Sequence, residues 1–179
     1  MSDRIFMQHQ AILDLIQGIA RLTRHQLEER GVHDPAMIGI HTGGVWIAQQ
    51  LHELLKIREP LGMLDISFYR DDFTRIGMNP QVKPSCIPYE VEERHIILVD
   101  DVIQSGRTIR AAMNEIFDFG RPASILLVSL IERSGRELPI QPDVTGLQPP
   151  LVDEEHIRLQ GPEPLELRIS GNRGSREAS

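Results

Sequence analysis

Residues 96–108 read IILVDDVIQSGRT, and this stretch determines the fold class of the chain. Ile96 to Val99 form a short apolar run, which is the pattern of a strand buried on both faces of a parallel sheet. Asp100 and Asp101 follow, where we expect that strand to end. Ligands of open α/β sheets bind at the carboxyl ends of the strands. Two acids at this point therefore indicate binding rather than packing.

The residues after the two acids predict a phosphate site. Ser105-Gly106-Arg107-Thr108 leads into a helical pattern of apolar residues. Glycine allows a tight turn, and the N–H groups at a helix start favour an anion, to which the two hydroxyls add donors. Each part alone is often just a helix cap, but acids beside an anion site suit a sugar phosphate, whose hydroxyls donate to carboxylates. A response-regulator acid pocket has no need of the glycine, so we disfavour it.

Composition limits the classes of protein. The chain has 179 residues, 40% of them hydrophobic, which fits one α/β domain over 1–170 with a disordered tail over 171–179. Its only cysteine is Cys86, so we expect no intrachain disulfide and a reducing cytoplasm. No apolar run reaches membrane-spanning length. A net charge of −7 argues against a surface devoted to nucleic acid, but leaves room for a local arginine patch.

Two segments before the central stretch contain further candidates. Residues 7–30 read as an amphipathic helix, on which Arg21 and Arg24 form either a solvated face or a phosphate-contacting strip. Residues 37–40 read as a strand that opens into His41-Thr42-Gly43-Gly44. Two glycines before a helix make either a second anion site or only a tight turn.

The remaining segments complete an α/β pattern. We expect strands over 61–69 and 124–131, a long loop over 70–93 that serves as a lid or a plain surface turn, and a polar segment over 132–137 at the ligand edge. Residues 143–146 read as a turn. Two short strands, 156–159 and 165–169, would form a small cap.

These residues resemble a known family. VDDVIQSGRT is similar to the ribose-phosphate signature of type I phosphoribosyltransferases. DISFYRDD at 65–72, GRPASI at 120–125 and RELPIQPD at 136–143 resemble the PyrR family of pyrimidine operon regulators, whose members are also uracil phosphoribosyltransferases. The resemblance implies an α/β fold with a central, mostly parallel sheet flanked by helices and a small hood of short strands. It also implies a dimer or larger homo-oligomer.

The resemblance assigns roles at the centre of the site. Asp100 and Asp101 would bind the ribose hydroxyls of phosphoribosyl pyrophosphate (PRPP), and Mg²⁺ would reach them through the substrate. Arg70 would close over the pyrophosphate. The residues implied in binding PRPP or UMP are Thr42, Gly43 and Gly44, which meet the pyrophosphate, and Val102, Ile103, Gln104, Ser105, Gly106, Arg107 and Thr108, of which the last four hold the 5′-phosphate.

Further roles concern the acceptor and the regulatory partner. Purine-type relatives carry an aspartate where this chain has Gln104, and glutamine is not a base, which favours a pyrimidine. Arg133, Arg136 and Asp143 are candidates for the uracil side from their position in the sequence. Arg21 and Arg24 are candidates for contact with operon leader RNA.

The chain departs from the family at one turn. Typical members read KTRG where this chain reads His41-Thr42-Gly43-Gly44. Losing one charged hydrogen bond to the leaving group costs about 2 to 3 kcal/mol, on the order of a hundredfold in rate. We therefore expect weak uracil phosphoribosyltransferase activity, with two alternatives: a catalytically silent nucleotide-sensing regulator, or an enzyme for another nucleobase.

Overall fold

The structure is a computed structural model that describes residues 2–67 and 85–171. Within these ranges the helices and strands, in chain order, are β1 (Ser2–Met7), α1 (His9–Glu29), β2 (Ala36–Ile40), α2 (Gly43–Leu55), β3 (Gly62–Leu64), β4 (His95–Ile103), α4 (Arg107–Phe119), β5 (Ser124–Glu132), β6 (Val144–Leu147), β7 (His156–Gln160) and β8 (Glu166–Gly171).

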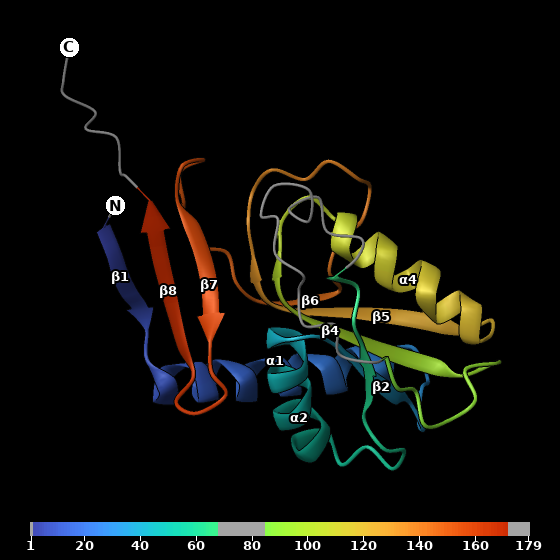
Figure 1. Cartoon of the computed structure of the whole chain (residues 1–179). Coiled ribbons are helices and arrows are strands. Elements are labelled where there is room, and N and C mark those ends of the chain that lie inside the picture. Colours follow the sequence, from blue (N-terminus) through green and yellow to red (C-terminus); the bar gives the residue numbers. More distant parts are fainter. Residues whose placement is uncertain (1, 68–84, 172–179) are drawn as a thin grey trace.

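A five-stranded parallel sheet forms the centre of the molecule, in the order β3-β2-β4-β5-β6. Figure 1 shows α4 on one face of this sheet and α1 and α2 on the other. Alternate residues of β4 enter different cores: Ile97 and Val99 pack with α1 and α2, and Ile96 and Leu98 pack with α4. A strand covered on both faces needs an unbroken apolar run, which is why residues 96–99 predicted it correctly.

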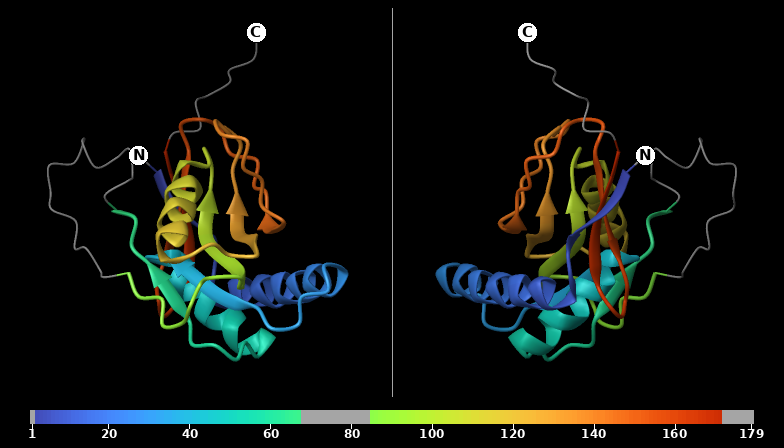
Figure 2. Two further views of the ribbon diagram at one scale, coloured as in Figure 1. Left: turned by 90° about the vertical axis from the view of Figure 1, so that its right-hand side faces the viewer. Right: turned by 90° about the vertical axis from the view of Figure 1, so that its left-hand side faces the viewer.

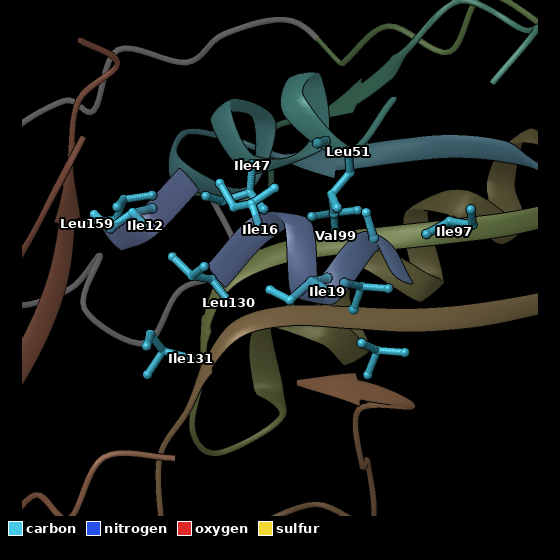
Figure 3. Packing of buried hydrophobic residues seen from close by; sticks show 14 of the residues in the cluster. Ile12, Ile16, Ile19, Ile47, Leu51, Ile97, Val99, Leu130, Ile131 and Leu159 are labelled. Carbon is cyan, nitrogen blue, oxygen red and sulfur yellow. The ribbon is translucent and has the colours of Figure 1, made fainter. Parts of the chain in front are cut away.

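The helix α1 packs through one face, which Figure 3 shows from close by. Ile12, Ile16 and Ile19 recur at helical spacing and are buried against α2, β4 and β5. The buried face continues through Ala20 and Thr23, which lie four residues after Ile16 and Ile19. Leu22 lies outside this face and is 52% exposed.

A separate antiparallel sheet of three strands, in the order β1-β8-β7, forms the hood. Figure 1 shows the hood beside the central sheet, and in the right-hand view of Figure 2 the hood faces the viewer. The two expected cap strands are confirmed as β7 and β8. The strand β1 was not expected, because its partner β8 lies more than 150 residues further along the chain.

Two expectations about edge segments were wrong. Residues 144–147 form the edge strand β6 beside β5, where the sequence had suggested a turn. In the described part of the 61–69 segment, only Gly62–Leu64 are a strand. Residues 68–69 of that segment and residues 70–84 of the expected lid, Arg70 included, fall outside the described residues, as does the expected tail after residue 171.

No helix among the described residues is long and apolar enough to cross a membrane.

Candidate active site

The paired acids lie at the ligand edge of the sheet. The strand β4 pairs with β2 only as far as Val99, but with β5 as far as Ile103, so it continues past Asp100 and Asp101 instead of ending before them. The expected end of the strand was therefore too early. Asp100 is 1% exposed and accepts a hydrogen bond from the N–H of Asp101 at 3.0 Å, whereas Asp101 is partly exposed.

The turn at Thr42-Gly43-Gly44 rests directly on these acids. A Cβ atom on Gly43 would collide with the Asp101 carboxylate, and one on Gly44 would lie 2.6 Å from the Val99 carbonyl oxygen. Only glycine permits this approach. The helix α2 begins at Gly43, so its N-terminus, which favours an anion, faces the acids at close range.

The third part of the site is the bend before α4. Gly106 has φ 92°, a conformation that glycine adopts freely, and α4 begins at Arg107. The Ser105 hydroxyl accepts the N–H of Arg107 at 3.2 Å, so part of its capacity is used within the bend. The Ser105 carbonyl accepts the N–H groups of Glu137 and Leu138, both at 3.0 Å. The segment after β5 thereby supports the bend.

The residues between the acids and the bend divide into buried and accessible positions. Ile103 is buried in the core beneath α4, Val102 is partly buried, and Gln104 is exposed. The side chain of Arg107 pairs with Glu137 at 2.7 Å. Among the expected binding residues of this stretch, Ile103 can therefore reach a ligand only through its backbone.

Two arginines hold Gln104. Arg133 donates from Nη1 to the Gln104 side-chain oxygen at 3.1 Å, and Arg136 donates from Nη1 to the Gln104 carbonyl at 2.5 Å. Arg133 is only 7% exposed, and this burial lowers the pKa of its guanidinium. The Nε atoms of both arginines are buried and have no hydrogen-bond partner among the described residues. The structure thus brings these two expected acceptor-side residues to the ligand edge.

Glu132 anchors this group, a role that we did not predict. Its buried carboxylate accepts a hydrogen bond from Arg136 at 2.6 Å. Three further side chains donate to it: Gln141, Thr145 and Gln148. The polar run after β5 pointed to this edge, but the donors come from β6 and its flanks, which the sequence had suggested were a turn.

The third acceptor-side candidate, Asp143, is not brought to this edge. It precedes β6, and its carboxylate accepts the N–H of Leu127 at 2.7 Å and pairs with Arg30 at 2.5 Å. Leu127 lies five residues before Glu132 on β5, about 16 Å along the strand. Both oxygens of Asp143 join the sheet to the end of α1, which indicates a structural role.

The two acids are the candidate metal ligands of the site. The described residues contain no group of three or more histidines, cysteines or acids that could hold a metal ion. The two acids supply oxygen ligands of the kind that Mg²⁺ prefers.

Arg21 and Arg24 are both exposed on α1, and Arg24 donates to the Leu54 carbonyl at 3.0 Å.

Comparison with known proteins identifies the family. The phosphoribosyl transferase domain model matches residues 7–161. The chain is 55% identical to the bifunctional protein PyrR of Nitrosococcus oceani over 157 residues, which are 87% of this chain and 89% of the relative. The chain belongs to the PyrR family of type I phosphoribosyltransferases. The PyrR protein of Pseudomonas fluorescens is 54% identical and is covered to 93%.

Solved structures agree with the PyrR-family fold. A hypoxanthine phosphoribosyl transferase of Trypanosoma cruzi aligns with a TM-score of 0.65 and 20% identity, over 83% of this chain and 78% of that one. The hypoxanthine-guanine phosphoribosyltransferase of Bacillus anthracis gives a TM-score of 0.65 and 17% identity, over 82% and 84%. At such identities these likenesses establish the fold alone. The family and fold expected from the sequence motifs are confirmed.

Proposed function

We propose that this PyrR-family chain is a uracil phosphoribosyltransferase that also regulates the pyrimidine operon in response to UMP and PRPP. In the reaction, the bond between ribose C1 and pyrophosphate breaks, a bond from C1 to uracil N1 forms, and the N1 proton leaves. The observation that carries the proposal is the junction of Asp100 and Asp101 with two glycine-bearing helix starts. One substrate that needs both acids and two anion sites is a ribose with a 5′-phosphate and a pyrophosphate.

The chemistry follows from where charge develops. As pyrophosphate departs, C1 becomes cationic and negative charge grows on the leaving group. The N-terminus of α2, at Gly43 and Gly44, supports that growing charge, and the bend at Ser105 to Thr108 holds the 5′-phosphate. Asp100 and Asp101 bind the ribose hydroxyls and favour the cation. We assign closure over the pyrophosphate to Arg70.

Magnesium suits this arrangement. Bound with PRPP, Mg²⁺ would supply positive charge to the leaving group, and Asp100 and Asp101 would hold it through the substrate.

The residues around Gln104 support a pyrimidine acceptor. Uracil presents two carbonyl oxygens that accept hydrogen bonds. The Gln104 side-chain oxygen already accepts from Arg133, so its amide nitrogen is the group left to donate. Because glutamine does not accept a ring proton, this site fits a base that needs no carboxylate partner.

A direct assay tests the enzyme proposal. Labelled uracil, cytosine and hypoxanthine are each incubated with the protein, PRPP and Mg²⁺, and nucleotide formation is measured. We expect UMP from uracil alone, at a low rate because the turn at His41 to Gly44 lacks the cations of the family pattern. Nucleotide from another base would reassign the acceptor, and UMP binding without turnover would leave only a sensor.

The regulatory half is tested with RNA. We expect the protein to bind the leader of its own pyrimidine operon, with UMP changing the affinity. We expect Arg21→Gln combined with Arg24→Gln to weaken binding, and the control Arg110→Gln, an exposed arginine on α4, to leave it unchanged. Absence of binding at every salt concentration would reject this role. Gel filtration tests the expected homo-oligomer.

A further inference from the structure

A partly buried ion pair links β1 to the residue just before β7, within the hood. Arg4 of β1 donates from Nη2 to Glu155 Oε1 at 2.8 Å, across 151 residues of sequence. The side chain of Glu155 is 0% exposed, whereas that of Arg4 is 40% exposed. The second carboxylate oxygen accepts the N–H of Val152 at 3.3 Å. A carboxylate buried to this extent needs such partners, because an uncompensated buried charge is costly.

The same residue, Glu155, contacts the acceptor side through its backbone. Arg133 donates from Nη2 to the Glu155 carbonyl at 2.6 Å and from Nη1 to the Gln104 side chain at 3.1 Å. One guanidinium therefore joins the hood to the residue that we place beside the base. The planar group is rigid, so moving its hood end displaces its Gln104 end.

The Glu155 carboxylate also attracts Arg133. Burial lowers the pKa of Arg133, while the charges of Asp153 and Glu155 act in the opposite direction. Arg4 binds the carboxylate of Glu155 and Arg133 binds its carbonyl, so the two guanidinium groups meet at one residue.

We propose that Arg4 is a positioning residue for the acceptor base. By pairing with Glu155, Arg4 keeps Arg133 on Gln104, and this contact sets the affinity for uracil. The inference rests on the proposed function, and it assigns to the N-terminal strand a part in choosing the acceptor. Without Arg4, the carboxylate has one cation fewer and draws the guanidinium of Arg133 away from Gln104.

The test compares two arginines of the hood that each pair with an acid more than 150 residues away in the sequence. Arg168 of β8 pairs with Asp3 of β1 at 3.1 Å, so Arg168→Gln is matched to Arg4→Gln. We expect Arg4→Gln to raise KM for uracil about fivefold, the effect of one net hydrogen bond, with KM for PRPP and kcat within about twofold of wild type. We expect Arg168→Gln to leave all three unchanged. Arg4→Lys keeps the charge and should retain most of the affinity.

A double-mutant cycle isolates the proposed competition. In a Glu155→Gln background the anion is gone, so adding Arg4→Gln should change KM for uracil no further. If Arg4→Gln does not fold, Arg4→Lys is compared with Arg4 in the wild-type and in the Glu155→Gln background. Calorimetric UMP binding should follow the same order of affinities.

Either of two results with the single variants would overturn the proposal: a wild-type KM for uracil in folded Arg4→Gln, or an equal rise in Arg168→Gln. An effect of Arg4→Gln that persists in full in the Glu155→Gln background would overturn it as well. If the wild-type protein forms no UMP, the proposed enzyme fails, but UMP calorimetry still tests the positioning by Arg4.

Discussion

Adding one methyl group at Gly44 tests the geometry on which the proposed site depends. In Gly44→Ala, the new Cβ would lie 2.6 Å from the Val99 carbonyl oxygen and 3.1 Å from Asp100 Cα. Ordinary contact begins at 3.4 Å, so the separation must grow by 3.4 − 2.6, or about 0.8 Å. Both obstructing atoms belong to the backbone of the central strand β4. The start of α2 must therefore move.

This displacement has two measurable effects. Overpacking against a fixed backbone lowers the free energy of unfolding by about 1 to 3 kcal/mol. The turn also carries the proposed pyrophosphate site and rests against the acids. A misplacement of about 1 Å in a reacting assembly lowers the rate on the order of a hundredfold. Alanine is the better helix former by about 1 kcal/mol, so helix propensity opposes the loss and does not cause it.

The assay is UMP formation at saturating PRPP, alongside denaturant unfolding. The matched control is Gly18→Ala on α1, where the added Cβ would have its nearest neighbour, Arg21 Nη2, at 3.8 Å. We expect the control to be as active as wild type and slightly more stable. A Gly44→Ala protein with wild-type rate and stability would refute the close approach of the turn to β4.

Three further predictions follow from other contacts. Asp101→Asn should lower the rate of UMP formation by about a hundredfold with little change in melting temperature, because a charged hydrogen bond to ribose is lost; an unchanged rate would remove Asp101 from the site. Asp143→Asn should lower the free energy of unfolding by about 1 to 3 kcal/mol yet leave KM for uracil unchanged, and a raised KM would restore Asp143 to the acceptor side. Burial and the nearby charge of Glu59 raise the pKa of Tyr89, so the phenol stays neutral in the folded state at a pH where it ionises in the unfolded chain. The free energy of unfolding should therefore fall as the pH rises above about 10. Unfolding measured over a pH series should show a smaller fall in Tyr89→Phe.

Sequence patterns were most informative where structure is local. The apolar run of β4, the acids after it and the bend before α4 lie within 13 residues, so their proximity follows from chain connectivity. The periods of α1 and of β7 and β8 were equally readable. Position alone also placed Arg133 and Arg136 at the correct edge, because the carboxyl ends of parallel strands meet there.

The elements and contacts that the sequence did not predict have partners distant in the chain. The strand β1 carries the charged residues Asp3 and Arg4 and pairs with β8, which is distant in the sequence. No local pattern therefore predicted a strand there. The strand β6 follows turn-forming residues and is held by pairing with β5. No sequence pattern indicated the contact of Arg4 with Glu155, because 151 residues separate them.

The place of β8 in the hood determines when the protein can finish assembling. β8 is the middle strand of that sheet and the last described strand to leave the ribosome, whereas β1 is the first. During synthesis β1 stays unpaired until β8 has emerged, and such nonlocal pairing is slow. A nascent chain halted before β8 would already contain the residues of the proposed phosphate sites but would lack the middle strand of the hood.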